Sequence, residues 1–154
     1  KNKSGHIEVD FKSTLPLIVS AQPDPRKDTR RSIKENFLQN VVDPAAGIFN
    51  LAANQCTTTS KVYDGKRRYD IKILNKEFIK LKDSMLSKNE IETFKCNFEI
   101  VRLAGYTKKE LKKFPKKGIM WIKKHEKINF FYPTKIQINS KWGNFLCIIN
   151  EGAI

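Results

Sequence analysis

The sequence predicts a mainly β domain, either a curved antiparallel sheet or a partly open barrel, with one short helix at about residues 43–54. Three observations predict this class. Several segments alternate apolar and polar side chains with the period of two that half-buried strands show. The dipeptide Asp64-Gly65 is typical of hairpin turns. The clearest signals for a helix occur in one segment only.

The N-terminal part of the chain predicts two strands and a connection. Residues 5–11 (GHIEVDF) alternate apolar and polar residues, and residues 15–20 continue as a second strand. Residues 21–32 contain two prolines and mixed charge, which predicts an exposed connection. Residues 32–42 are ambiguous between a short helix and an extended run.

The helix is predicted from its first residues. Asp43 can accept hydrogen bonds from the free amides of the first turn, and Pro44 suits the first helical position. The alanines and Leu51 that follow favour a helix.

A hairpin is predicted after the helix. Residues 57–63 are rich in β-branched side chains, Asp64-Gly65 forms a two-residue turn that needs positive φ angles, and residues 67–74 return as a strand. In this strand one face is predicted to be apolar and the other to face water: Tyr69, Ile71 and Ile73 on the first, and Arg68, Asp70 and Lys72 on the second. Gly65 is therefore a structural residue.

The C-terminal half predicts further strands. Residues 94–103 alternate apolar and polar residues. Residues 107–118 open with a T-x-x-E capping box, but Pro115 leaves only a helical turn or a mobile basic loop. Three more strands are predicted at residues 118–124, 132–139 and 142–149.

Length and charge limit the classes of function that the chain can have. A chain of 154 residues makes a single domain, here residues 1–154, and no apolar run approaches the roughly 18 residues that a membrane-spanning helix needs. The net charge of +14 can attract anionic lipids or polymers, although biased codon usage explains a Lys-rich composition as well. The basic residues form no stripe with interleaved exposed aromatics, so we expect no nucleic-acid binding.

Five basic residues are candidate contacts to an anion or an envelope component: Lys66, Arg67, Arg68, Lys123 and Lys124. Neither Arg67 nor Arg68 is expected to carry chemistry. At least one of them is predicted to pack its stem across the sheet, with its head either in water or paired with Asp64 or Asp70.

We find no catalytic pattern. The two histidines, His6 and His125, have no neighbouring nucleophile motif, and no glycine-rich phosphate loop is present. The cysteines lack the short paired spacings of a zinc site. We therefore expect no enzyme activity, no metal and no cofactor.

The three cysteines leave two alternatives. A Cys56–Cys96 bridge is sterically feasible, and closing a loop of about 40 residues would contribute about 4 kcal/mol. The other alternative is three reduced cysteines in a cytosolic protein. In either case Cys147, between Leu146 and Ile148, is predicted to be a buried free thiol.

An ordered set of motifs resembles a bacterial family, the domain of unknown function 3108. These motifs are DPAAGIFNL, Cys56, VYDGKRRYDIKI, Cys96 followed by LAGY, MWI, YPTKIQI and WGNFL. They run from about residue 5 to the C-terminus. Family members usually carry a signal peptide and further N-terminal strands, so the resemblance implies a domain that lacks its N-terminal strands and its signal peptide here.

The resemblance implies export to the periplasm, where a Cys56–Cys96 disulfide persists. By analogy with periplasmic lipoprotein carriers, we expect a non-catalytic domain that binds an apolar or cell-envelope ligand in its curved sheet. The alternative is an interaction protein whose Lys-rich loops dock on anionic lipid or envelope polymer, and an unrecognised enzyme comes third. The expected partner is a lipid or envelope component, and the oligomeric state stays open.

Overall fold

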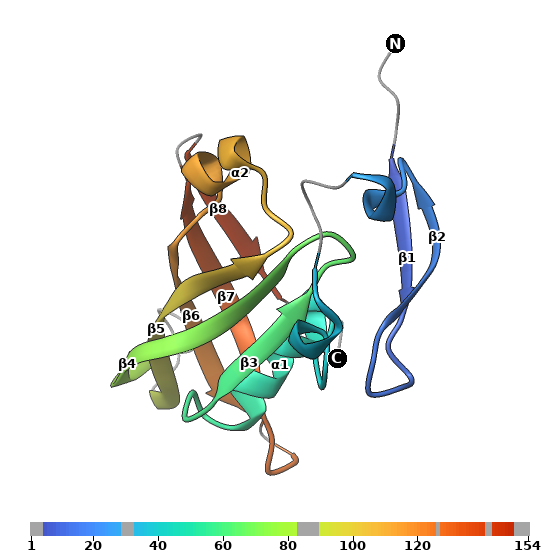
Figure 1. The fold of residues 1–154 in the computed structure, drawn as a ribbon. Coiled ribbons are helices and arrows are strands. Elements are labelled where there is room, and N and C mark those ends of the chain that lie inside the picture. Colours follow the sequence, from blue (N-terminus) through green and yellow to red (C-terminus); the bar gives the residue numbers. More distant parts are fainter. Residues whose placement is uncertain (1–4, 29–32, 83–89, 126, 141–142, 150–154) are drawn as a thin grey trace.

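The structure is a computed structural model that describes residues 5–28, 33–82, 90–125, 127–140 and 143–149. The fold is mainly β, with 53% strand, which confirms the predicted class. It contains a two-stranded sheet and a six-stranded antiparallel sheet (Figure 1). The six strands follow one another in chain order, and the sheet is not closed into a barrel.

The six-stranded sheet consists of β3 (Thr59–Tyr63), β4 (Arg68–Lys82), β5 (Glu90–Ala104), β6 (Lys117–Lys124), β7 (Phe131–Ser140) and β8 (Gly143–Ile148). The predicted strands are present, but β4 continues well beyond residue 74, where the prediction ended it. The register shifts between Ile73 and Asn75, so Leu74 is an extra residue that interrupts the apolar alternation. Pairing with β5 continues past this bulge.

The N-terminal strands form a separate hairpin of β1 (His6–Asp10) and β2 (Leu17–Gln22). The 3-10 helix η1 (Pro25–Lys27) follows within the predicted connection, of which residues 29–32 lie outside the described part. The ambiguous stretch before the main helix contains the 3-10 helix η3 (Glu35–Phe37). It ends in an extended residue, Val42, which bridges to Val62 on β3.

Helix α1 (Pro44–Ala53) forms as predicted. The Asp43 carboxylate accepts hydrogen bonds from the amides of Ala45 and Ala46 at 2.8 and 3.0 Å. At the other end the amide of Cys56 donates to the Leu51 carbonyl and that of Gln55 to the Ala52 carbonyl. This pattern closes helices whose next residue is left-handed, and Gln55 has a φ of 49°.

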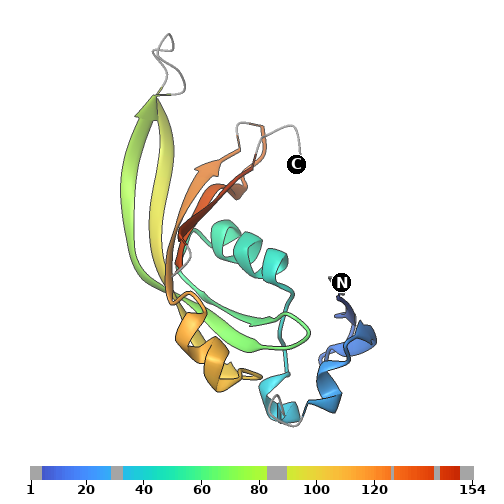
Figure 2. The ribbon, with the colours of Figure 1, turned by 90° about the horizontal axis from the view of Figure 1, so that it is seen from above.

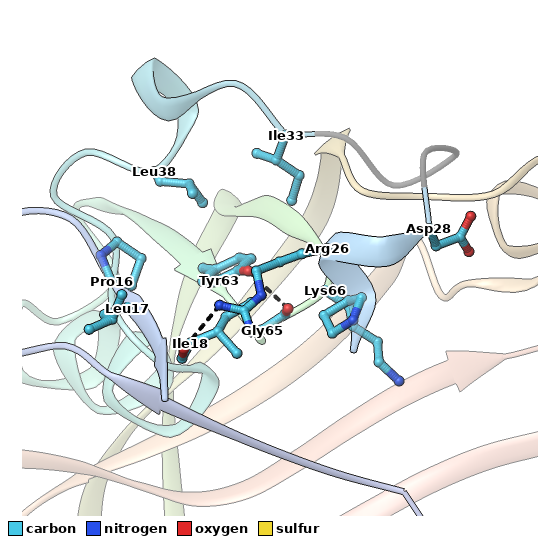
Figure 3. Close-up of a pocket in the computed structure, with 11 residues that line it drawn as sticks. Pro16, Leu17, Ile18, Arg26, Asp28, Ile33, Leu38, Tyr63, Gly65 and Lys66 are labelled. Atoms are coloured by element: carbon cyan, nitrogen blue, oxygen red, sulfur yellow. Dashed lines mark hydrogen bonds between the residues drawn. The ribbon is translucent and has the colours of Figure 1, made fainter. Parts of the chain in front are cut away.

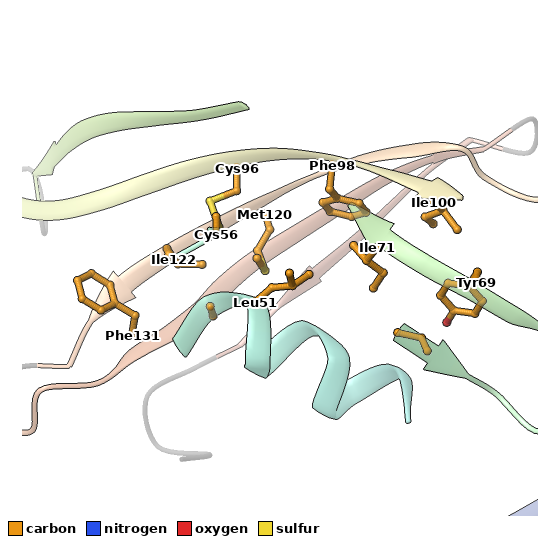
Figure 4. Packing of buried hydrophobic residues seen from close by; sticks show 12 residues of the cluster. Leu51, Cys56, Tyr69, Ile71, Cys96, Phe98, Ile100, Met120, Ile122 and Phe131 are labelled. Carbon is orange, nitrogen blue, oxygen red and sulfur yellow. A yellow bond between two sulfur atoms is a disulfide. The ribbon is translucent and has the colours of Figure 1, made fainter. Parts of the chain in front are cut away.

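Helix α1 lies on the concave side of the six-stranded sheet (Figure 2). It packs mainly against β3 and β7, and Leu51 and Ala52 are fully buried. Figure 4 shows the sheet residues that cover them. The centre of this core consists of Leu51, Ala52, Val62, Ile71, Cys96, Phe98, Met120 and Ile122.

The Cys56–Cys96 disulfide is present and joins the end of α1 to β5 (Figure 4). Cys56 follows Gln55 with a positive φ of its own, 57°. Two successive left-handed residues turn the chain from the helix axis towards the sheet. Cys96 is completely buried on the concave face, so the bond lies inside the core.

A second short helix, α2 (Lys108–Lys113), connects β5 to β6, where the sequence left a helical turn or a mobile loop open. Thr107 and Glu110 form the predicted capping box. The helix stops at Phe114, before Pro115. The fold therefore has more helix than the one short helix that the sequence predicts.

The β3–β4 turn is longer than the predicted two residues. Tyr63 and Arg68 form the last paired positions, which leaves residues 64–67 in the turn. The Asp64 carboxylate accepts hydrogen bonds from the amides of Lys66 and Arg67 at 3.0 and 2.7 Å. The Asp64 amide still donates to the Arg67 carbonyl at 3.2 Å, but the Arg67 amide bonds to the Asp64 side chain, so the regular ladder ends at Tyr63 and Arg68. Gly65 has the positive φ that was predicted, 84°.

Two predictions about exposure are wrong. Arg68, predicted to face water, is only 3% exposed, because η3 covers it and the Phe37 carbonyl accepts a hydrogen bond from its Nε. Cys147, predicted to be buried, is a free and exposed cysteine. It lies on β8, the last strand of an open sheet, and therefore lacks the second layer that its apolar neighbours suggested.

Candidate functional site

A pocket of about 510 Å³ lies between the β1–β2 hairpin, η1 and the β3–β4 turn (Figure 3). Its lining is mainly apolar. The apolar lining residues are Pro16, Leu17, Ile18, Pro25, Ile33 and Leu38, and the others are Arg26, Asp28, Tyr63, Gly65 and Lys66.

The hairpin reaches the turn through a close contact at Gly65. A Cβ atom at this position would overlap the Ile7 side chain and crowd Val9, both on β1. Glycine is thus required here twice, by its positive φ and by the approach of β1. This contact places the hairpin beside the turn and so forms one wall of the pocket.

Arg26 occupies the pocket in a fixed position. Its guanidinium forms an ion pair with Asp24 at 2.8 Å. It also donates a hydrogen bond to the Ile18 carbonyl at 3.4 Å (Figure 3). Asp24 also caps η1 by accepting from the Arg26 amide. The hydrogen bonds from Arg26 hold the pKa of the partly buried Asp24 carboxyl below its usual value.

Tyr63 contributes a buried phenol. Its hydroxyl donates a hydrogen bond to the Gly65 carbonyl at 2.8 Å (Figure 3). Burial, with a smaller contribution from Asp64, raises the pKa of this phenol to about 12. Any phenol is protonated at neutral pH, and the raised pKa keeps Tyr63 a hydrogen-bond donor at alkaline pH as well.

The structure distributes the five candidate basic residues over different surroundings. Lys66 lines the pocket. Arg67 pairs with Asp64 at 2.7 Å and stacks over Phe114 at 4.6 Å, beside a second cavity of about 460 Å³. Arg68 is buried and pairs with Asp70 at 2.6 Å. Both arginines thus form the ion pairs that were predicted as one alternative.

Lys123 and Lys124 lie elsewhere, at the end of β6. Lys123 is paired with Thr93 on β5, whereas Arg68 is paired with Ala104 on the same strand. Thr93 and Ala104 are 11 residues apart, which corresponds to about 35 Å of extended strand. The basic residues singled out in the sequence therefore do not form one contact surface.

Most of the pocket lining was not recognisable from sequence. Leu17, Ile18 and Arg26 belong to segments that predicted a plain strand and a connection, and they become neighbours of Lys66 only because the hairpin packs on Gly65. The alternation of Ile7 and Val9 on one face was the one signal that this hairpin packs against something.

The described ranges contain neither a cluster that could bind a metal ion nor a helix that could span a membrane. No three His, Cys, Asp or Glu side chains gather there in a way that could hold a metal ion. Within the same residues, no helix is both long and apolar enough to cross a membrane.

Comparisons with protein-family models, with curated proteins and with solved structures found no match to this chain. The resemblance to the domain of unknown function 3108 therefore stays a prediction.

Proposed function

We propose that this protein is a non-catalytic binding domain that holds a small amphiphile, with an apolar chain and an anionic end, in the pocket beside the N-terminal hairpin. One observation carries the proposal: the pocket joins apolar side chains of β2 and the following segments to the cations Arg26 and Lys66. Its volume of about 510 Å³ lies within the range of small-molecule sites, which are concave and mostly apolar with a few polar groups.

The two cations differ in whether they already form an ion pair within the protein. Arg26 already carries an ion pair with Asp24. Lys66 forms no ion pair with another described residue, and its backbone amide donates to the Asp64 carboxylate. We therefore assign the anionic end of the ligand to Lys66 and the apolar chain to the side of Leu17 and Ile18.

This position replaces the curved sheet as the expected ligand site. The concave face is occupied by α1, whose Leu51 and Ala52 are fully buried against the strands. A ligand there would have to displace the helix, which the Cys56–Cys96 disulfide ties to β5. The pocket beside the hairpin needs no such change.

The periplasm is the compartment that we propose. The Cys56–Cys96 disulfide supports an oxidising compartment, because disulfides persist there and are rare in the cytosol. The resemblance to the domain of unknown function 3108 supports the same assignment.

A fluorescent unbranched fatty acid, cis-parinaric acid, tests the proposal. Leu17 and Val19 are similarly exposed neighbours on β2, but only Leu17 lines the pocket. We expect Leu17→Thr to weaken binding about tenfold, since it removes apolar contact with the chain. Val19→Thr, the matched control, should leave the affinity unchanged. Equal affinities of both variants would place the probe elsewhere and overturn the proposal.

The anionic end is tested separately with Lys66→Gln. This change should weaken binding of the fatty acid but not of the corresponding fatty alcohol, which lacks the negative charge. Lys124→Gln removes the same charge from the exposed end of β6 and serves as the control. A loss for both probes would mean that Lys66 acts through packing.

A second function, docking on anionic lipid, has its own supporting observation. Helix α2 and the segment after it expose Leu111 and five lysines: Lys108, Lys109, Lys112, Lys116 and Lys117. Co-sedimentation with anionic vesicles, compared with zwitterionic ones, tests it. Docking through these lysines should be lost at high ionic strength. It should also be lost in the double variant Lys112→Gln with Lys116→Gln. Binding of the fatty alcohol in the pocket should persist in both cases.

A further inference from the structure

Strand β8 is an edge strand with apolar side chains exposed to solvent. Phe145, Leu146 and Ile148 are 59%, 54% and 65% exposed, and Cys147 between them is exposed as well. In the described part of the chain no strand pairs with its outer edge (Figure 1). An edge of this kind is a ready template for another strand.

Both faces of β8 are apolar. Phe145 and Cys147 are paired with Ile138 and Ile136 of β7, and Ile136 is paired in turn with the core residue Met120, so these side chains belong to the concave face. Leu146 and Ile148 point to the convex face. A strand that pairs with β8 must therefore offer apolar side chains on both faces.

The opposite edge of the same sheet is protected. Val42 bridges to β3: its amide donates to the Lys61 carbonyl at 2.9 Å, and its carbonyl accepts from the Tyr63 amide at 3.0 Å. Strand β3 also carries a charge, at Lys61. Residues 143–149, in contrast, include no charged residue and no proline, and their pairing with β7 has no bulge. Among the residues that the structure describes, β8 thus carries none of the devices that block edge pairing.

The free hydrogen-bonding groups of β8 can be assigned from its inner edge. The Ile149 amide donates to the Thr134 carbonyl of β7. Because these groups alternate in direction along an antiparallel strand, Phe145 and Cys147 also bond to β7, whereas Asn144, Leu146 and Ile148 point outward. The outer edge therefore presents N–H and C=O groups at three residues.

We propose that β8 pairs with β8 of a second copy of this chain, antiparallel and about a two-fold axis, to form a continuous twelve-stranded sheet. The second copy is the occupant that fits this edge, because it offers a strand that is uncharged and apolar on both faces. Self-pairing also satisfies an isologous two-fold interface, in which one patch meets itself.

The register follows from the side chains. Placing Cys147 opposite Cys147 of the second copy sets Leu146 opposite Ile148 and Phe145 opposite Ile149, so the facing pairs within residues 145–149 are all apolar. Leu146 and Ile148 then exchange the outward hydrogen bonds, and the two Cys147 residues form a non-hydrogen-bonded pair with Cα atoms about 4.5 Å apart. This lies within the range of about 4.4–6.8 Å that a disulfide spans.

The dimer is expected to be weak. The six residues of β8 are few beside the roughly 20–30 residues on each side of a standard interface. The net charge of +14 on each copy opposes association at low ionic strength. Added salt should therefore strengthen the dimer, whereas it should weaken binding of an anionic ligand. The dimer and the amphiphile-binding function can thus be disproved independently of each other.

Sedimentation velocity at increasing protein concentration tests the proposal, with diamide as a cross-linking oxidant. Two Cys147 thiols lose two protons and two electrons to diamide and form one disulfide. We expect a monomer–dimer equilibrium that salt shifts towards the dimer, and a cross-linked species of twice the chain mass on non-reducing gels. Cys147→Ser should abolish the cross-link and keep the equilibrium.

Leu146→Lys should abolish both readouts, because a charge at the centre of the edge has no counterpart across the axis. Leu74→Lys, on the exposed bulge of β4, is the control and should dimerise normally. A second control, Leu74→Cys combined with Cys147→Ser, measures random cross-linking of an exposed thiol. A monomer at all concentrations, or cross-linking no faster than in this control, overturns the proposal, even if Leu146→Lys fails to fold.

Discussion

Gly65 links the local structure of the turn to the packing of the hairpin. Its φ of 84° is unfavourable for any other residue type, and its missing side chain leaves room for Ile7. The first requirement could be read from the Asp-Gly dipeptide. The second is a tertiary contact that the sequence did not reveal.

Replacing Gly65 by alanine should therefore lower the free energy of unfolding by more than the strained turn alone explains. Gly143 also has a positive φ, 126°, but a Cβ there would meet nothing within 4 Å. We expect Gly143→Ala to lower the free energy of unfolding by about 1 kcal/mol and Gly65→Ala by about 2–4 kcal/mol. Urea unfolding measures both. Ile7→Ala should recover part of the loss at Gly65, and a strictly additive double variant would argue against the contact.

Arg68 is a buried cation with several partners. Its guanidinium donates to the Phe37 carbonyl at 2.7 Å, to the Tyr69 carbonyl at 2.5 Å and to Asp70 at 2.6 Å. These bonds attach the segment around η3 to the start of β4. Arg67 pairs with Asp64 near the surface, at 28% side-chain exposure, where ion pairs contribute little.

The two arginines should respond differently to the same change. Arg68→Met leaves the Phe37 carbonyl and Asp70 without their donor, and should lower stability by about 3 kcal/mol. Arg67→Met should lower it by about 1 kcal/mol. Comparable urea midpoints for the two variants would contradict the buried assignment of Arg68.

At the scale of elements, the end of α1 is fixed by its cap and by the disulfide. The Cys56–Cys96 bond closes a separation of 40 residues that contains β3, β4 and the turn. It therefore restricts the unfolded chain over the very segment that forms one edge of the sheet.

Removal of the disulfide should destabilise the fold without rearranging it. Cys56→Ala with Cys96→Ala should lower the free energy of unfolding by up to about 4 kcal/mol, mainly through the entropy of the unfolded chain. Urea unfolding measures the loss, and far-UV circular dichroism checks that the strand content persists. Cys147→Ser, outside this loop, should change stability by less than about 0.5 kcal/mol. A large loss of strand signal would mean that the bond shapes the native state.

At the scale of the molecule, buried phenols make stability depend on alkaline pH. Burial raises the pKa of Tyr69, as it does that of Tyr63, from 10.0 to about 12. Below pH 10 the phenols are protonated in both states, so their contribution to stability is complete. As the pH rises from 10 towards 12, the unfolded chain loses protons that the folded chain retains, and stability falls.

Tyr69→Phe should flatten this fall. The phenyl ring keeps the contact with Phe114, which the Tyr69 ring makes at 5.9 Å, but it carries no titrating group. We expect the urea midpoint to drop less between pH 9 and about pH 11 in the variant than in the parent chain. Lysines titrate alike in both proteins and cancel in the comparison. Parallel curves would show that Tyr69 titrates normally in the folded protein.

Local patterns in the sequence were enough to predict the helices and strands and part of their connections. The alternation of residues 94–103, the Asp43-Pro44 start of α1 and the positive φ of Gly65 depend on near neighbours in the chain. Sequence therefore predicted them correctly. The Cys56–Cys96 pair was one of two alternatives, and the structure confirms it.

Only the tertiary structure decided which faces are covered. The sequence pattern predicts that Arg68 faces solvent, but η3 buries it. The pattern predicts that Cys147 lies in the core, but it is exposed on the last strand. The pocket exists because β1 packs on Gly65, far away in sequence. The alternation of apolar and polar residues tells which side chains share a face of a strand. The layer that covers this face comes from elsewhere in the chain. Burial, the pocket and the open edge at β8 therefore cannot be predicted from any local pattern.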